Sequence, residues 1–218
     1  MVMKKTTFYF YRAVGLLAAF ILWTVALGFV DVQAIGPRGS VVGFATINGW
    51  VHDFTGVHMR LYTVTDWLGL VPIGFCMGFA LLGVTQWITR KRLARVDADL
   101  FVLGGFYVVV LAVYLFFETV VVNVRPVLID GCLETSYPSS TTLLVLCVMP
   151  TAVMQLRGRL PNVLCRRWVC GALWAFVAFM VAGRLLSGVH WVSDIVGGGL
   201  LSAGLVQLYG GIVLLQKR

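Results

Sequence analysis

The stretch that decides the fold is residues 100–122, LFVLGGFYVVVLAVYLFFETVVV, in which Glu118 is the single charged side chain. A helix needs about 20 apolar residues to cross the hydrocarbon of a bilayer, so this stretch predicts a membrane-spanning helix. Five further apolar runs lie on either side of it. We therefore expect six spans, at residues 8–30, 62–88, 100–122, 141–156, 168–186 and 195–215. The fourth is short and contains Pro150.

The composition supports the same conclusion. Hydrophobic residues make up 60% of the chain and charged residues 12%, whereas soluble domains carry about 25% charged residues. The net charge of +8 does not indicate a nucleic-acid partner, because the basic residues form short clusters between apolar runs, as in the loops of membrane proteins. The five cysteines lack metal-ligand spacing and are expected to be apolar core residues rather than disulfides or zinc ligands.

The basic residues also predict the orientation. All 17 except Arg38, Arg60, Arg125 and Arg184 fall on one side of the predicted spans. By the positive-inside rule that side is cytoplasmic, with both termini on it. The first apolar run is long for a signal-peptide core and is expected to stay as a span. The prediction is an all-α integral membrane protein, a six-transmembrane-helix bundle forming a single domain over residues 1–218.

The long connection after the first span, residues 31–61, contains apolar residues that recur at intervals of three and four. They are Phe44, Ile47, Trp50 and Val51. This pattern predicts a short interfacial helix between spans 1 and 2, with Trp50 at the level of the headgroups. A lid or lipid-entry rim and a passive anchor are both compatible with it.

The acidic residues point to the chemistry, since all nine except Asp97 and Asp99 fall on the predicted extracytoplasmic side. His190 and Asp194 are four residues apart, which places them on one helical face. A carboxylate there can orient the imidazole, whose other nitrogen is free to attack an electrophile. The guanidinium of Arg184 matches phosphate oxygens. The structural alternative is a buried His–Asp hydrogen bond beside an arginine that reaches the headgroups.

Two further segments bear on that choice. Arg125-Pro126 follows the third span, and Pro138-Ser139-Ser140-Thr141 opens the fourth. Proline followed by serines favours a helix start, whose free N–H groups form an anion site. Taken alone, the second segment is better explained by plain helix capping than by an anion site.

In order, these segments resemble the three-part signature of the type 2 phosphatidic acid phosphatase superfamily, which includes vanadium haloperoxidases. That signature reads Lys-x6-Arg-Pro, then Pro-Ser-Gly-His, then Ser-Arg-x5-His-x3-Asp. Here the parts are Glu118-x6-Arg125-Pro126, Pro138-Ser139-Ser140-Thr141 and Gly183-Arg184-x5-His190-x3-Asp194.

The resemblance implies roles for these residues. His190 would be the nucleophile that forms a phosphohistidine, and Asp194 would orient it. Arg125 and Arg184 would hold the phosphoryl oxygens, together with Ser139 and the N–H groups of Ser140 and Thr141. No metal or other cofactor is implied, and the partners are the bilayer and a phosphorylated lipid substrate, with no nucleic acid.

Three departures from the signature matter. Glu118 replaces the lysine, so the phosphate site loses a cation, and Glu118 is expected to repel the substrate or to pair with Arg125 or Arg184. Thr141 replaces the histidine that is thought to protonate the leaving group, and threonine is a poor proton source. General acid help is typically worth ~10²–10⁴-fold, and a phosphate leaving group needs less of it than an alkoxide. Gly183 for serine is a mild change.

We therefore predict a membrane phosphatase that hydrolyses a lipid phosphate or diphosphate, preferably a polyprenyl diphosphate, at the extracytoplasmic face of a plasma membrane, by its compact design a bacterial one. The alternatives are a phosphorylated-lipid-binding protein with weak turnover and a lipid phosphotransferase. A transporter is disfavoured because the charges gather at one face rather than at the midplane. The oligomeric state and the roles of Glu134, His52 and His58 stay open.

Overall fold

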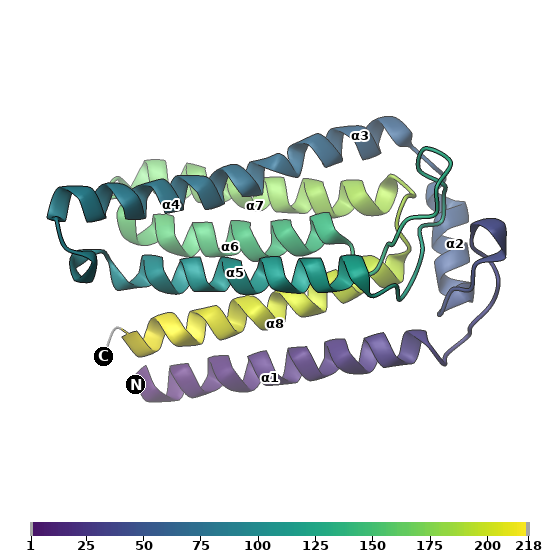
Figure 1. Ribbon diagram of the computed structural model, residues 1–218, viewed down its shortest axis with the longest axis horizontal. Coiled ribbons are helices and arrows are strands. Elements are labelled where there is room, and N and C mark those ends of the chain that lie inside the picture. Colours follow the sequence, from purple (N-terminus) through teal and green to yellow (C-terminus); the bar gives the residue numbers. More distant parts are fainter. Residues whose placement is uncertain (1, 217–218) are drawn as a thin grey trace.

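The computed structural model describes residues 2–216 as a bundle of long helices that run side by side (Figure 1). Its elements are α1 (Val2–Leu27), α2 (Ala45–Thr55), α3 (Met59–Leu68), α4 (Leu70–Arg90), α5 (Ala98–Thr119), α6 (Ser140–Arg159), α7 (Val163–Leu186) and α8 (Val192–Gln216). With α3 and α4 counted together, the described residues hold six spans that are long and apolar enough to cross a membrane. The predicted six-span, all-helical fold is confirmed.

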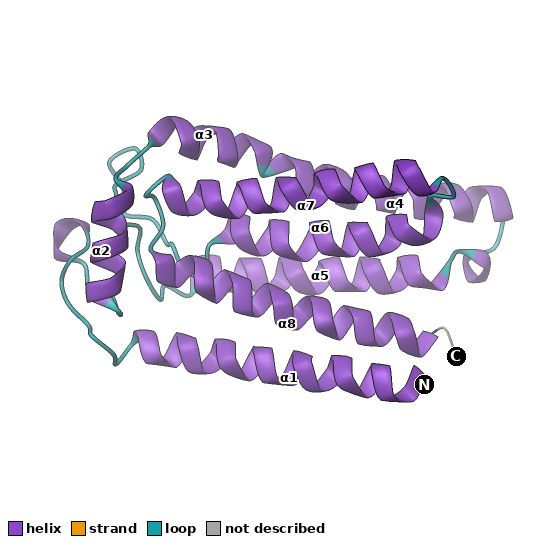
Figure 2. Cartoon of the chain, turned by 180° about the vertical axis from the view of Figure 1, so that it is seen from behind, coloured by secondary structure: helices purple, strands orange, loops and turns teal. Residues whose placement is uncertain are grey.

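The two ends of the bundle differ. Figures 1 and 2 place the start of α1 and the end of α8 together at one end, which we call the terminal end. The opposite end, called the loop end, carries α2 and the connections of residues 120–139 and 187–191. Among the described residues, both ends of the chain thus lie on the same side of the bundle, as an even number of spans requires.

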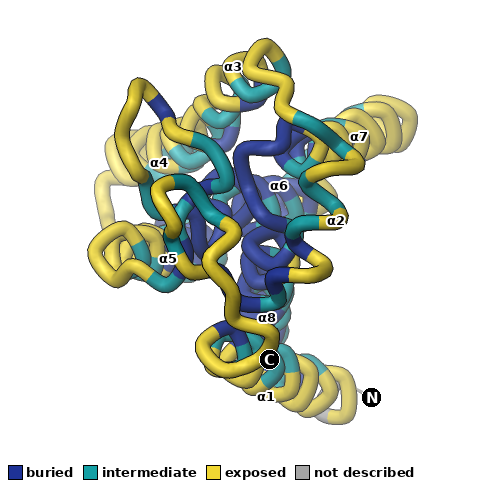
Figure 3. Tube along the Cα trace, turned by 90° about the vertical axis from the view of Figure 1, so that its right-hand side faces the viewer, coloured by how far each residue is buried: buried dark blue, intermediate teal, exposed yellow. Residues whose placement is uncertain are grey.

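Helix α6 forms the centre of the bundle. Within its most apolar window, 61% of the residues are buried in the protein, against 6% for the span made of α3 and α4. Figure 3 shows α6 in the middle, with the more exposed helices around it. The outer helices therefore turn apolar side chains toward lipid, which removes the cost that such surface would have in water.

Helices α1 and α8 pack closely because small residues face larger ones across their interface. A Cβ added at Gly204 would lie 2.8 Å from the side chain of Leu17, and one at Gly210 would lie 2.6 Å from the ring of Tyr9. Without a hydrophobic driving force between helices in lipid, such close backbone approach is a main source of attraction. A similar approach holds the start of α8 against the loop before α6, where a Cβ added at Gly197 would lie 2.5 Å from the ring of Tyr137.

The second predicted span, residues 62–88, is present as Met59–Arg90, but it is not one uninterrupted helix. It divides into α3 and α4 at Gly69. Pro72 lacks the N–H that would bond to the Leu68 carbonyl, and its ring crowds that carbonyl, so the helix is interrupted one turn before the proline. The fourth span is longer than predicted and continues through Pro150 to Arg159.

The helix predicted in the first connection is present as α2. Figures 1 and 2 show it lying across the loop end of the bundle, next to the start of α8. Its inward face buries Asn48, while Trp50 and Phe54 stack on each other on the exposed outer face. The expected distribution of apolar residues is therefore found, with an aromatic pair free to meet headgroups.

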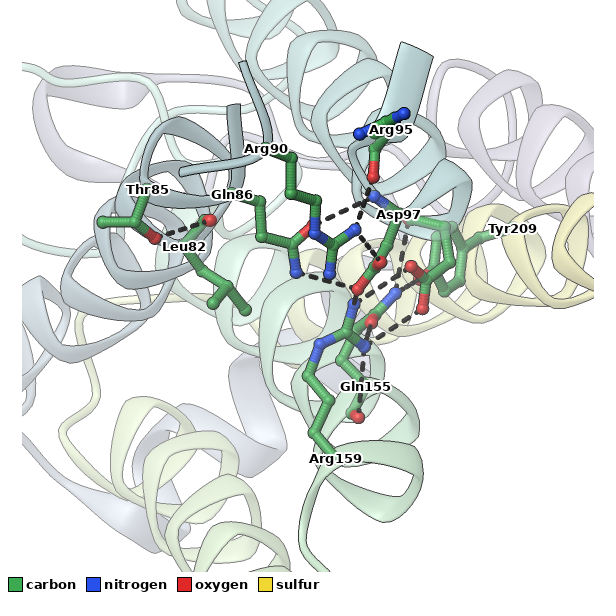
Figure 4. A network of polar contacts seen from close by, with 10 residues as sticks. Leu82, Thr85, Gln86, Arg90, Arg95, Asp97, Gln155, Arg159 and Tyr209 are labelled. Atoms are coloured by element: carbon green, nitrogen blue, oxygen red, sulfur yellow. Dashed lines mark hydrogen bonds and ion pairs between the residues drawn. The ribbon is translucent and has the colours of Figure 1, made fainter. Parts of the chain in front are cut away.

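A network of polar side chains joins four helices at the terminal end (Figure 4). Asp97, just before α5, accepts from Gln86 at 2.8 Å and pairs with Arg90 at 2.8 Å. Arg159 at the end of α6 pairs with Asp97 at 3.6 Å and with Asp99 at 3.0 Å. The hydrogen bond with Arg90 is the main reason why the pKa of Asp97 lies below its usual range. The two acidic residues of this end are therefore neutralised within the bundle.

Candidate active site

Three segments that are distant in sequence meet at the loop end. Arg125 follows α5, Ser139 and Ser140 open α6, and His190 lies between α7 and α8. The connection after α5 is held as a narrow loop, in which the backbone N–H of Arg125 donates to the Glu134 carbonyl at 3.0 Å. The ends of four central helices thus place these side chains in one region.

His190 faces Asp194, although the two do not share one helical face as the four-residue spacing predicted, because His190 lies in the turn before α8 and only Asp194 lies on the helix. The two side chains are buried, and His190 Nδ1 lies 3.6 Å from Asp194 Oδ2. That distance is too long for a hydrogen bond, and Nδ1 has no other partner. Asp194 is itself held in place, because Oδ2 accepts the Trp191 N–H at 3.0 Å and Oδ1 accepts from Asn123 Nδ2 at 3.4 Å. A small inward movement of the imidazole would complete the His–Asp contact.

His190 is held neutral at physiological pH. Burial lowers the pKa of His190 to about 4, and the charges of Arg125 and Arg184 act in the same direction, while Asp194 opposes them. The second ring nitrogen, Nε2, accepts a long hydrogen bond of 3.5 Å from Arg125 Nη1. A neutral imidazole whose Nδ1–H faces a carboxylate carries a lone pair on Nε2, and this lone pair can act as a nucleophile once the long contact with Arg125 is released.

Arg184 presents unused donors in a buried position. Its side chain is 2% exposed. Nη2 donates to Asp66 Oδ1 at 3.0 Å and to the hydroxyl of Thr141, while Nε and Nη1 have no partner. A buried donor without an acceptor costs free energy, more so when it is charged. The guanidinium is therefore ready to receive an anion.

Arg125 is the second cation of the site. Its Nε lies 3.0 Å from Glu134 Oε2, in an ion pair that lacks hydrogen-bond geometry. The ring of Tyr62, on α3, lies 5.7 Å from the guanidinium carbon of Arg125 and 5.0 Å from that of Arg184. Both distances suit a cation–π contact. Tyr62 therefore lies against both arginines and limits their movement.

The start of α6 faces the same region. Ser139, fully buried, donates its backbone N–H to the Asp194 carbonyl at 3.2 Å, while its hydroxyl has no partner. The first N–H groups of a helix have no partner within the helix, and they favour anions. Ser140 and Thr141 line the adjoining cavity. This geometry fits the predicted oxyanion site.

A cavity of about 990 Å³ leads from these groups into the bundle. Its polar end contains both arginines and three carboxylates, and its other end is apolar. The polar end is lined by Asp66, Glu118, Arg125, Glu134, Thr141 and Arg184, and the apolar end by residues of α4, α5 and α6 such as Leu70, Ile73, Leu111, Leu144 and Val148. His190 lines a much smaller adjoining pocket together with Glu118 and Ser140.

The predicted residues are brought together, and their catalytic roles stay predictions. The seven that gather at the loop end around this cavity are Arg125, Ser139, Ser140, Thr141, Arg184, His190 and Asp194. Glu118 lines the cavity, but the carboxylates paired with the two arginines are Glu134 and Asp66.

Sequence reasoning missed the contribution of α3. Tyr62 and Asp66 are four residues apart and share the face that covers both arginines. The available signal was an aromatic residue and a carboxylate at helical spacing at the start of an apolar span. Of the two histidines left open, His52 packs its ring against Trp191, and His58 Nε2 lies 3.0 Å from the Thr55 carbonyl.

Comparisons with known proteins agree with this geometry. The model of the PAP2 superfamily matches residues 101–215, a range that includes every predicted site residue. Among solved structures, the fold is similar to the crystal structure of a transmembrane PAP2-type phosphatidylglycerolphosphate phosphatase from Bacillus subtilis. That match has a TM-score of 0.56 and 20% sequence identity, and it covers 95% of this chain and 98% of the other. No protein of curated function matches the chain.

Proposed function

The chain belongs to the PAP2 superfamily, and from that premise we propose that it is a multi-pass membrane phosphatase that hydrolyses a lipid diphosphate through a phosphohistidine. The observation that carries the proposal is the buried, neutral His190, which faces Asp194 on one side and Arg125 on the other. The distribution of basic residues supports an extracytoplasmic position for this site, and the membrane that we propose for it is a plasma membrane.

The cavity supports a lipid as the substrate. Its polar end holds the guanidinium groups of Arg125 and Arg184, which can bind a phosphoryl group in competition with the three carboxylates beside them, and its apolar end extends between α4, α5 and α6. An apolar cavity can hold a hydrocarbon chain away from water with few specific contacts. A few polar groups then fix the orientation of the ligand. The head of the substrate then lies at Arg125 and Arg184.

In the first step, His190 Nε2 attacks phosphorus, and the bond from phosphorus to the leaving oxygen breaks. The electron pair of that bond goes to the leaving group, and the imidazole becomes a phosphorylated imidazolium whose Nδ1–H faces Asp194. The two arginines, Ser139 and the start of α6 receive the equatorial oxygens. Such preorganised donors usually provide the largest part of the rate enhancement.

The leaving group decides the preferred substrate. Thr141 stands beside Arg184 and offers a hydroxyl, which is a poor acid at neutral pH. When an alkoxide leaves, proton donation matters greatly, whereas a phosphate is a weak base that departs without it. We therefore favour a diphosphate, such as a polyprenyl diphosphate, over a phosphate monoester.

In the second step, water attacks the phosphohistidine from the cavity side. A P–O bond forms, the P–N bond breaks, and the electron pair returns to His190. The proton lost by water passes to a carboxylate of the cavity. Asp66 is suited to this role, because it is half-exposed to the cavity and is kept close to the phosphate site by its ion pair with Arg184.

The alternative of a lipid-binding protein with weak turnover is favoured by one observation. Both arginines already pair with carboxylates, Arg125 with Glu134 and Arg184 with Asp66, so a phosphate must compete with them. A phosphotransferase differs only in the second step, in which a lipid hydroxyl replaces water.

Phosphate release from the purified protein in detergent tests the proposal. Polyprenyl diphosphate should be hydrolysed faster than polyprenyl phosphate and phosphatidate, with EDTA having no effect. His190→Ala should reduce the rate by at least about 10³-fold, whereas His58→Ala, at an exposed histidine of the same end, should leave it unchanged. No release from any of these lipids would exclude a phosphatase, and faster release from monophosphates would exclude the diphosphate preference.

A further inference from the structure

The turn that carries His190 is followed directly by α8, whose first turn contains Asp194, and the first N–H groups of that helix need partners from outside it. The preceding residue, Trp191, has no side-chain oxygen to offer. Asp194 reaches back to the Trp191 N–H at 3.0 Å, which is one half of a capping box. The N–H of Ser193 receives its partner from a different part of the chain.

That partner is Asn48, on α2. Asn48 Oδ1 accepts the Ser193 N–H at 3.1 Å, and Asn48 Nδ2 donates to Ser193 Oγ at 2.9 Å and to the Gly43 carbonyl at 2.7 Å. Asn48 and Ser193 are buried. The amide thus uses both of its donor hydrogens and caps α8 across a separation of 145 residues.

Other contacts from α1 and from the first connection hold the same turn. Trp23 Nε1 donates to the Ser193 carbonyl at 3.1 Å, and the His58 N–H donates to the Ser187 carbonyl at 2.9 Å. Gly188, at φ +67°, lies so close to Gly56 that an added Cβ would be 1.9 Å from the Gly56 carbonyl oxygen. The segment from Ser187 to Asp194 is therefore held in place by contacts with residues that precede α3.

We propose that Asn48 is a positioning residue, which fixes the first turn of α8 and thereby sets the distance between His190 and Asp194. This proposal rests on the proposed function. The imidazole of His190 lies 3.6 Å from the carboxylate of Asp194. A small rotation of the first turn of α8 therefore decides whether a hydrogen bond forms between them during phosphoryl transfer. Asn48 touches neither arginine, so substrate binding does not depend on it.

The test compares Asn48→Ala with Asn162→Ala. Asn162 is a matched control, because its Oδ1 caps α7 by accepting the Cys165 N–H at 3.0 Å at the terminal end. Misplacement of a reacting group by about 1 Å costs up to about 10²-fold. Asn48→Ala should therefore lower kcat by about 10- to 100-fold with KM within about twofold of wild type, and Asn162→Ala should leave kcat within about twofold. Inorganic phosphate should raise the Tm of Asn48→Ala as much as it raises that of wild type.

Ser193→Ala removes the bond from Asn48 Nδ2 to Ser193 Oγ and leaves the Ser193 N–H capped by Asn48 Oδ1, so it should retain kcat within about threefold of wild type. It also keeps the proposal testable if Asn48→Ala does not accumulate in membranes, since a tenfold or larger fall in kcat for Ser193→Ala would overturn it. A wild-type kcat in Asn48→Ala, a change in KM alone, or an equal loss in Asn162→Ala would do the same. An inactive wild-type protein would instead contradict the proposed function.

Discussion

At the scale of single residues, the burial of His190 separates it from an ordinary histidine. Its pKa is lowered to about 4, so the imidazole should stay neutral as the pH falls from 7 to 5 and become protonated only near pH 4. The chain has 3 histidines, so ¹⁵N-histidine protein carrying His52→Ala and His58→Ala leaves one imidazole to titrate by NMR. A midpoint near the ordinary value of 6.5 would show that the side chain is solvated rather than buried.

Thr141 gives a second prediction at this scale. Thr141→His introduces an acid beside Arg184, so turnover of a lipid phosphate monoester should rise by about tenfold or more, while diphosphate turnover changes little. The ratio of the two kcat/KM values measures this effect and cancels differences in folded protein. Thr142→His, one residue further along α6, serves as the control, and an equal gain for both substrates would contradict the leaving-group argument.

Sequence alone predicts some of the contacts in the site and misses others. His190 with Asp194, and Ser139 with Thr141, lie close together in the chain, so spacing predicts their proximity. Asp66 meets Arg184 across 118 residues, and no local pattern reports such a contact. The pairing of each arginine with a carboxylate therefore required the three-dimensional structure, since it depends on how α3 and the loop after α5 fold over the site.

At the scale of the elements, the span positions follow from hydropathy because the bilayer demands long apolar helices. The ends of the helices were predicted less well. Helix α7 starts at Val163 rather than at residue 168, because Asn162 caps it before the apolar run begins. The break at Gly69 was missed, because a proline within a membrane span gives no certain sign of interruption when neighbouring helices can compensate.

The polar network of the terminal end carries a prediction for the elements that it joins. Arg159→Ala removes ion pairs to Asp97 and Asp99, which should cost about 1 kcal/mol and lower Tm by about 2–4 °C. The pKa of Asp97 is lowered in the folded state, so its contribution to stability is present above the ordinary aspartate pKa of 3.8 and is lost as the pH falls below that value. The Tm difference between wild type and variant should shrink there. Arg157→Ala, on the same last turn of α6, is the control, and an equal effect would mean that the network adds nothing specific.

At the scale of the whole molecule, two native cysteines test the orientation. Cys132 is exposed in the loop before α6, at the loop end, and Cys165 is exposed near the start of α7, at the terminal end. In intact cells, a membrane-impermeant maleimide should label the wild type and Cys165→Ser but not Cys132→Ser. Permeabilised cells should label both single variants. Labelling of Cys132→Ser in intact cells would show that the protein has the opposite orientation in the membrane.

The gathering of every site group at one end of the bundle has a consequence for the lipids themselves. Such an enzyme samples a single leaflet, and molecules in the other leaflet are outside its reach until they cross. In sealed vesicles, turnover should therefore slow sharply once the accessible leaflet is depleted, and it should then continue only at the rate of transbilayer exchange. For a long-chain lipid with a charged head, that exchange is slow, so in a cell the supply to this site depends on whatever moves its substrate across the membrane.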